Sequence, residues 1–410
     1  MFRSICGPAF ALVLALAAAA RGADWPQLHG PARDGRSAET GLNWDWAPGG
    51  PKPVWTFDAG RGWAGPAVSG DSLILFHRVG DDEVVACLDA ATGKEKWASK
   101  YPTKYKDDFG FDDGPRATPT VADGVVYTLG ADADFTATEL ATGKKLWARN
   151  LMAEYRPAKG FFGVACSPLV RDKKLYVNVG AKGAGVVCFD ATTGKEVWKS
   201  TDDGASYSSP VLGEFDGKPA VVFLTRTGLR VLDPANGKSM YDFPWRPRIS
   251  SSVQAASPVV WKDEVFLTVS YDTGGVLAQL KGGQVEEVWS NDKTLSSQYN
   301  TPVRVGNYLY GTHGRSDAGA ALLRCVAWKT GEVKWSEPKF GGASLIAVDG
   351  GLLALNEGGE LVRFDATPDG YKERARATLL AKGTRPAPAL ANGRLYARDS
   401  KQLVCVSLKK

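Results

Sequence analysis

Short runs of alternating apolar and polar residues recur along most of the chain, separated by turns rich in glycine, proline and aspartate. A period of two places successive side chains on opposite faces of a strand, so these runs predict half-buried β-strands. No long stretch has the spacing of an amphipathic helix. The pattern therefore predicts an all-β protein, with strands at Val125–Leu129, Leu175–Val179, Val265–Val269 and Tyr308–Tyr310.

A phrase that ends in tryptophan returns every 40 to 50 residues or so, a period typical of stacked supersecondary units. It occurs at Cys87–Trp97, Thr138–Trp147, Cys188–Trp198 and, in a shorter form, Ala327–Trp335. Its Asp-x-x-Thr-Gly-Lys core has the composition of a hairpin turn, in which glycine adopts a positive φ. We expect one tryptophan per unit to pack between neighbouring sheets: Trp97, Trp147, Trp198, Trp289 and Trp335.

The cysteines follow the same register. Cys87, Cys188, Cys325 and Cys405 each lie two residues before the position of the repeat's aspartate. Equivalent positions in different sheets lie beyond the ~7 Å Cα separation that a disulfide spans. We therefore predict small buried apolar side chains and no disulfide.

A second landmark, a small residue followed by proline and an aliphatic residue, marks the start of each unit. Eight starts lie near residues 65, 118, 167, 209, 257, 301, 344 and 387, and the seventh lacks its proline. The last unit ends at Leu408 without a closing turn or tryptophan, whereas Pro51–Asp58 carries Trp55 in the expected context. An N-terminal strand that completes the last sheet closes a ring and leaves no free edge. The prediction is one eight-bladed β-propeller over residues 51–410.

The composition of the chain indicates where the protein is located and which partners it lacks. Residues 1–23, with Arg3 before an apolar run, have the features of an export signal. No other stretch approaches the ~18 apolar residues of a membrane span, so we expect an exported, non-spanning monomer of the periplasm or cell surface. The formal net charge of +5 is spread without a basic cluster, which argues against nucleic-acid binding.

Residues 24–50 lack the repeat and contain Trp25, Trp44 and Trp46. We expect these tryptophans to pack the segment against the outside of the ring. A partner-binding arm is the alternative.

The repeat phrase resembles the tryptophan-docking motif of pyrroloquinoline-quinone (PQQ) repeat propellers, over essentially all of residues 51–410. The opening Asp24–Gly35 is similar to that of exported PQQ-like propellers of the planctomycete type. The superfamily includes calcium- and PQQ-dependent alcohol dehydrogenases and the non-enzymatic lipoprotein of the outer-membrane barrel-assembly machine. The resemblance implies either a binding and assembly scaffold of the cell envelope, which we favour, or a quinoprotein dehydrogenase acting on an alcohol or sugar.

Residues just before each first strand crowd the mouth of a propeller's channel, a common position for ligands. Two arginines and three aromatic residues there suit a flat anionic ligand, since guanidinium groups bind carboxylates and aromatic faces stack. PQQ with Ca²⁺ is one such ligand among many flat anions, and the alternative is that these residues only fill the channel and hydrogen-bond to loop carbonyls. The partner we expect for the protein is an envelope protein or a small anionic ligand. The candidate ring is Trp63, Arg116, Tyr207, Gln254, Tyr299, Asn300 and Arg385.

Other chemistry has weaker support. The ring positions supply Asn300 but no acid for calcium, and the nearest carboxylates belong to the loop Lys104–Arg116. We expect its pairs Asp107/Asp108 and Asp112/Asp113 to be solvated turn acids, because calcium-loop spacing is absent. The scattered His29, His77 and His313 predict no metal site.

Overall fold

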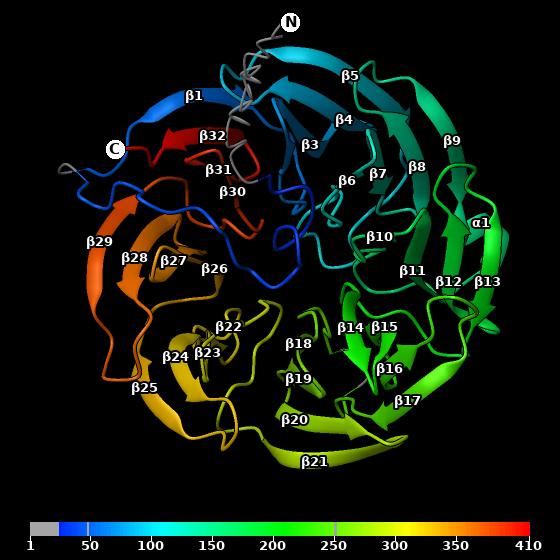
Figure 1. Ribbon diagram of the computed structural model, residues 1–410. Coiled ribbons are helices and arrows are strands. Elements are labelled where there is room, and N and C mark those ends of the chain that lie inside the picture. Colours follow the sequence, from blue (N-terminus) through cyan, green and yellow to red (C-terminus); the bar gives the residue numbers. More distant parts are fainter. Residues whose placement is uncertain (1–23, 47–48, 250–251) are drawn as a thin grey trace, which may run out of the picture.

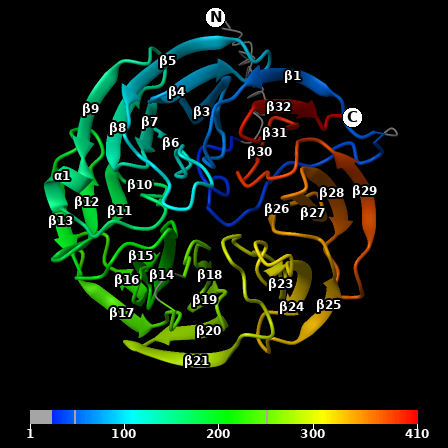
Figure 2. The same cartoon turned by 180° about the vertical axis from the view of Figure 1, so that it is seen from behind.

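In residues 24–46, 49–249 and 252–410, which the computed structural model describes, eight four-stranded antiparallel sheets surround one axis (Figures 1 and 2). The predicted all-β, eight-bladed propeller is confirmed. The predicted export signal, residues 1–23, lies outside the described residues. Each predicted unit start falls at or within two residues of an innermost strand.

From the axis outward, the first four blades are β2 (Ala67–Ser69), β3 (Ser72–Val79), β4 (Asp82–Asp89) and β5 (Glu95–Pro102); β6 (Thr120–Ala122), β7 (Val125–Leu129), β8 (Asp134–Glu139) and β9 (Lys145–Asn150); β10 (Leu169–Arg171), β11 (Lys174–Ala181), β12 (Ala184–Asp190) and β13 (Glu196–Ser200); β14 (Val211–Phe215), β15 (Lys218–Leu224), β16 (Gly228–Leu232) and β17 (Ser239–Pro244). The next three are β18 (Val259–Trp261), β19 (Glu264–Val269), β20 (Gly274–Lys281) and β21 (Gln284–Asn291); β22 (Val303–Val305), β23 (Tyr308–His313), β24 (Leu322–Ala327) and β25 (Val333–Glu337); β26 (Ala343–Val348), β27 (Gly351–Asn356), β28 (Glu360–Asp365) and β29 (Glu373–Thr378). The last blade is β30 (Ala389–Ala391), β31 (Arg394–Arg398), β32 (Gln402–Ser407) and β1 (Pro53–Asp58), and a short helix, α1 (Leu151–Tyr155), follows β9.

The ring closes as predicted, because the N-terminal strand β1 pairs with the C-terminal strand β32. Trp55 lies opposite Cys405 in this pair. The same cross-strand pair joins Cys87 to Trp97 within the first blade. The closing strand thus takes the register that covalently continuous blades use, and the eighth sheet has four strands like the other seven.

Each repeat tryptophan contacts the next blade, as predicted. The Nε1 of Trp97 donates to the carbonyl of Leu140 at 2.8 Å, and that of Trp147 to the carbonyl of Ala191 at 3.0 Å. The indole of Trp97 also lies against Gly143, where a Cβ would come within 2.7 Å of the ring. Gly143 has φ of 75°, so both its conformation and the close contact require glycine.

The cysteine prediction also holds among the described residues: Cys87, Cys166, Cys188, Cys325 and Cys405 are buried and free. Four of them lie on the third strand of a blade, directly opposite the docking tryptophan. A small side chain there leaves room for the indole. Burial raises the pKa of the Cys405 thiol to about 12, so it stays protonated.

The small residue before each proline has a structural role that its recurrence did not reveal. The backbone N–H of Thr118 donates to Ser167 Oγ, and that of Ser167 donates to Ser209 Oγ, both at 2.9 Å. Ser257 N–H donates to Thr301 Oγ1 in the same way. These hydroxyl groups join neighbouring blades at the innermost strands and satisfy amides that the sheets leave unpaired.

The prediction that the N-terminal segment packs on the outside of the ring is wrong for its first half. Residues 24–37, which we call the N-terminal plug, cross the middle of the ring (Figure 1). Trp25 pairs with Val68 of β2 in the first blade, Arg33 reaches the carbonyls before β10 and β14 in the third and fourth blades, and Ser37 N–H donates to Ala347 O of β26 in the seventh. The short innermost strands leave an axial space with unpaired edges, which the plug fills.

Arg33 anchors the plug at the axis. It is 4 % exposed, and its Nη1 donates to the carbonyls of Ser167 and Pro210, each at 3.0 Å. Its Nη2 donates to Thr120 Oγ1 at 3.1 Å and to Pro168 O. One guanidinium therefore ties three consecutive blades to the plug.

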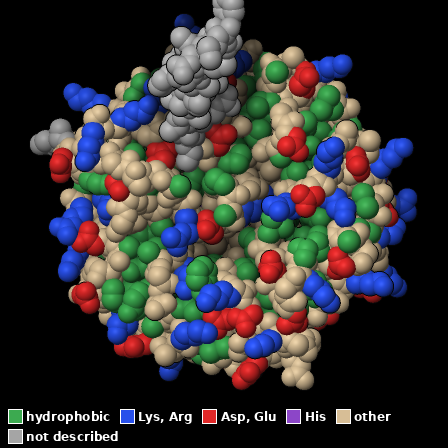
Figure 3. All heavy atoms as spheres, viewed as in Figure 1, with side chains coloured by type: hydrophobic (Ala, Val, Ile, Leu, Met, Phe, Trp, Pro, Cys, Tyr) green, Lys and Arg blue, Asp and Glu red, His purple; other side chains and the backbone are tan. Residues whose placement is uncertain are grey.

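The face viewed in Figure 3 shows no large patch of one charge. Basic and acidic side chains are interspersed over the face viewed in Figure 3, which agrees with the spread charge of the sequence. Within the described part of the chain, no helix has the length and hydropathy to cross a membrane.

Candidate functional site

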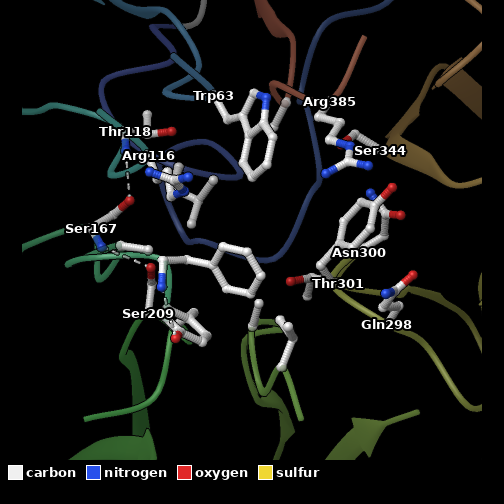
Figure 4. A pocket seen from close by; sticks show the side chains of 18 of the residues that line it. Trp63, Arg116, Thr118, Ser167, Ser209, Gln298, Asn300, Thr301, Ser344 and Arg385 are labelled. Carbon is white, nitrogen blue, oxygen red and sulfur yellow. Dashed lines mark hydrogen bonds between the residues drawn. The ribbon is translucent and has the colours of Figure 1, made fainter. Parts of the chain in front are cut away.

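A cavity of about 590 Å³ opens at the axis, inside the loops that lead into the innermost strands (Figure 4). Leu28 and His29 of the N-terminal plug line it, and the plug runs behind it. The cavity therefore lies between the plug and one face of the ring. Its volume falls within the range of about 300–1,000 Å³ typical of small-molecule sites.

The structure brings six of the seven predicted ring residues to this cavity: Trp63, Arg116, Tyr207, Tyr299, Asn300 and Arg385. Gln254 does not line it. The Gln254 side chain is fully buried, where Oε1 accepts from Arg226 Nη1 at 2.8 Å and Nε2 donates to Thr225 O at 3.2 Å. Its backbone carbonyl accepts from Tyr207 N–H at 2.9 Å, so Gln254 supports a lining residue from behind.

Arg116 is already neutralised. Its Nη2 forms an ion pair with Asp107 and donates to Asp112 O at 2.8 Å. The side chains of Arg116 and Asp107 are 5 % and 0 % exposed. The expectation of solvated turn acids is therefore wrong for Asp107 and Asp112, which are buried because a guanidinium and backbone amides compensate their charge.

Arg385 has a carboxylate partner that the sequence analysis missed. Its Nε lies 3.2 Å from Glu357 Oε1, and Tyr299 Oη donates to the same oxygen. Burial and the Glu357 charge raise the pKa of Tyr299, which keeps the phenol protonated. Glu357 follows β27 rather than preceding a first strand, so it fell outside the positions from which the ring was predicted.

The indole of Trp63 contacts both of these arginines. The guanidinium of Arg116 is 4.7 Å, and that of Arg385 4.6 Å, from the indole centroid. A third ion pair, Arg315 with Asp317, lines the cavity with Arg315 over the ring of Tyr271. Each lining arginine thus carries its own carboxylate.

The aromatic content of the mouth exceeds what the sequence predicted. Two loops, residues 103–119 and 156–168, bring together a group that we call the phenyl cluster, with centroid separations of 5.3–6.4 Å: Phe109, Phe111, Phe161 and Phe162. Phe109 and Phe111 are 54 % and 58 % exposed. Long loops without a repeat gave no periodic signal that would have singled these residues out.

Thr118, Ser167 and Ser209 lie on the Arg116 side of the cavity, and the side next to Arg385 carries further uncharged polar residues (Figure 4). We call this second group the amide wall; its members are Gln298, Asn300, Thr301 and Ser344. Asn300 Oδ1 accepts from Thr312 Oγ1 at 3.4 Å, while Nδ2 makes no hydrogen bond to any described residue. The wall therefore offers at least one donor to an occupant.

The histidines take no part in a metal centre among the described residues, where no group of three or more His, Cys, Asp or Glu side chains is arranged to hold an ion. His77 Nδ1 accepts from Gly60 N–H, and His313 Nδ1 from Ser296 N–H. Burial, with Arg33 nearby, lowers the pKa of His29 to about 4, so this cavity residue is neutral at physiological pH.

The cavity residues do not fit a calcium–quinone centre. A tricarboxylate needs cationic partners, and Arg116 and Arg385 already hold Asp107 and Glu357. Calcium needs several oxygen ligands, typically carboxylates, and the acids at this mouth are engaged with the arginines. Binding of PQQ thus stays a hypothesis, and the two arginines on which it rested are paired with carboxylates.

Fold and cavity together define a β-propeller with a cavity on its axis, and the sequence identifies the family. Residues 47–177 and 154–337 match the family described as outer membrane protein assembly factor BamB, a PQQ-repeat family, and the chain belongs to it. No curated protein matches the chain.

Solved structures show the same fold at low identity. BamB from Moraxella catarrhalis superposes with a TM-score of 0.61 at 15 % identity, covering 87 % of this chain and 98 % of that one. Quinohemoprotein alcohol dehydrogenase from Comamonas testosteroni gives 0.53 at 16 %, with coverages of 96 % and 82 %. The computationally designed Ika8 protein gives 0.59 at 12 %, with 87 % and 98 %. The same fold thus occurs in an assembly factor and in a dehydrogenase, so the fold alone does not determine the function.

Proposed function

We propose that this protein is a non-catalytic binding and assembly scaffold of the cell envelope, exported by its first 23 residues, whose cavity face receives a protein partner. The observation that carries the proposal is the exposed phenyl cluster. A monomeric protein seldom exposes several neighbouring large apolar side chains to water unless they contact another molecule.

The support is local. Phe109 and Phe111 stack with a centroid separation of 6.2 Å, and their loop is fixed from below by the buried pair of Arg116 and Asp107. A cluster held on a fixed loop loses little conformational freedom on binding, so more of its burial appears as affinity. The membership of the BamB family agrees with a partner-holding role but does not supply the partner.

A photo-crosslinking experiment tests this role. A photoreactive phenylalanine analogue at position 109 should cross-link one protein of the envelope in cells, in stoichiometric yield. The matched control places the same analogue at Trp261, an exposed aromatic residue at the turn between β18 and β19, away from the cavity. Equal cross-linking at both sites, or none at 109, would refute the scaffold.

The quinoprotein alternative has its own assay. PQQ and Ca²⁺ are added to purified protein, and quinone absorbance and alcohol-dependent dye reduction are followed. Turnover would refute the scaffold role and show that the protein is an oxidoreductase. Absence of turnover, together with a cross-link from position 109, would support the scaffold role.

A further inference from the structure

The cavity beneath the phenyl cluster combines aromatic rings with uncharged polar side chains. The rings include Trp63, Phe162 and Tyr207, with Phe162 and Tyr207 edge to face at 5.6 Å. The polar side chains include the amide wall, contributed by the loop before β22 and by β26. This lining suits an occupant that offers an apolar face to the aromatic rings and hydrogen-bonding groups to the polar side chains around it.

The charges of the lining residues restrict the class of ligand further. The lining arginines are Arg116, Arg315 and Arg385, and each is paired with an acid: Asp107, Asp317 and Glu357 respectively. A charged ligand would have to compete with these acids for the arginines or enter without a counter-charge of its own, and either is costly. A neutral ligand escapes this cost.

We propose that the axial cavity binds a neutral saccharide, a monosaccharide or disaccharide in its pyranose form. The C–H face of such a ring is apolar and packs on aromatic faces, while its hydroxyl groups both donate and accept. The free Asn300 Nδ2 and the hydroxyls of Thr301 and Ser344 provide the complementary groups. The cavity of about 590 Å³ has room for such a ligand.

This site goes beyond the scaffold role and does not depend on it. Saccharide binding needs only the purified chain, whereas the scaffold needs a partner in cells. A chain that binds saccharide and gives no cross-link at position 109 would keep this inference and refute the scaffold, and the opposite result would do the reverse.

The test is a titration of the purified full chain by calorimetry and saturation-transfer NMR. The probes are methyl β-glucoside and maltose as neutral saccharides, glucuronate and glucosamine as charged analogues, and benzene-1,3,5-tricarboxylate as a flat anion. We expect the neutral saccharides to bind and the charged analogues to bind at least about tenfold more weakly. Binding of the tricarboxylate in preference to every saccharide, or no saccharide binding at millimolar concentration, would overturn the proposal.

Two substitutions locate the binding. Asn300→Asp keeps the shape but removes the Nδ2 donor, and we expect saccharide affinity to fall about tenfold. Ser344→Ala removes a hydroxyl group from the same wall and serves if the first variant fails to fold. Trp261→Ala, away from the cavity, is the control and should bind as the native chain does. Unchanged affinity in a folded amide-wall variant would place any saccharide elsewhere and refute the cavity site.

Discussion

Neighbouring blades of this propeller are joined by one repeated contact at the rim, whereas at the mouth the loops differ from blade to blade. At the rim, neighbouring blades repeat one contact, in which an indole donates to a carbonyl of the next blade and lies on a turn glycine, as for Trp97 on Gly143 and Trp147 on Gly194. At the mouth, the loops differ in length and in residue type, and they share only the hydroxyl links between blades.

The difference shows where each kind of residue acts. The tryptophans at the rim are largely shielded from water and contact the backbone of the next blade. They therefore stabilise the ring and do not select a ligand. Mouth residues hold paired charges and exposed rings, so they shape a surface at some cost in stability. Four predictions test this division, from the largest expected effect to the smallest.

Trp198→Ala should cost the most. Trp198 is 8 % exposed, lies on Gly237 and donates to Pro234 O at 3.2 Å. Its loss should lower the free energy of unfolding by about 4 kcal/mol, measured by urea denaturation, because a cavity opens between two blades. Trp261→Ala, at a side chain 42 % exposed, should cost less than about 1 kcal/mol. Equal losses would mean that docking adds nothing to the ring.

Asp107→Asn should come next, at about 3 kcal/mol, since it leaves the buried Arg116 guanidinium without a counter-charge. Asp108→Asn is the neighbouring control. Asp108 pairs with Lys159 at the surface, and this exposed pair should be worth less than about 1 kcal/mol. The contrast is read from thermal or urea unfolding. If both variants unfold alike, the mouth charges do not act as described.

Glu83→Gln should change how stability depends on pH. Glu83 is fully buried, accepts from Tyr101 Oη and Ala131 N–H, and burial raises its pKa from 4.5 to about 7. Between these values the folded chain keeps a proton that the unfolded chain has lost, so native stability falls as pH rises through this window and levels off above it.

The glutamine variant lacks that loss. Its stability relative to the native chain should rise by on the order of 2 kcal/mol between pH 5 and pH 8, measured by urea midpoints. Histidines with lowered pKa values, such as His313, act in the other direction below pH 6.5 but cancel in this difference. A pH-independent difference would contradict the burial of a carboxyl group that titrates near neutrality.

Phe109→Ser should have the smallest effect on stability, within about 0.5 kcal/mol, because the side chain is 54 % exposed. The same change should abolish cross-linking from a photoreactive residue at Phe161, which neighbours it at 6.0 Å. A large fall in stability with partner binding intact would make the phenyl cluster a structural rather than a binding feature.

The sequence by itself determined the ring. Trp55 was recognisable as the missing docking residue of the last blade, and the structure pairs it with Cys405 as the repeat requires. Repeats make such inference reliable, because every blade must bury its faces against its neighbours by the same local code.

Only the tertiary structure decided what lies on the axis. It placed residues 24–37 across the ring, paired Arg116 with Asp107 and Arg385 with Glu357, and moved Gln254 behind the wall. The plug and the Arg385–Glu357 pair depend on segments that approach from different blades, whereas Arg116 and Asp107 meet within one loop, nine residues apart. No local period encodes such meetings, since they follow from closure of the ring and from the cost of burying an unpaired charge.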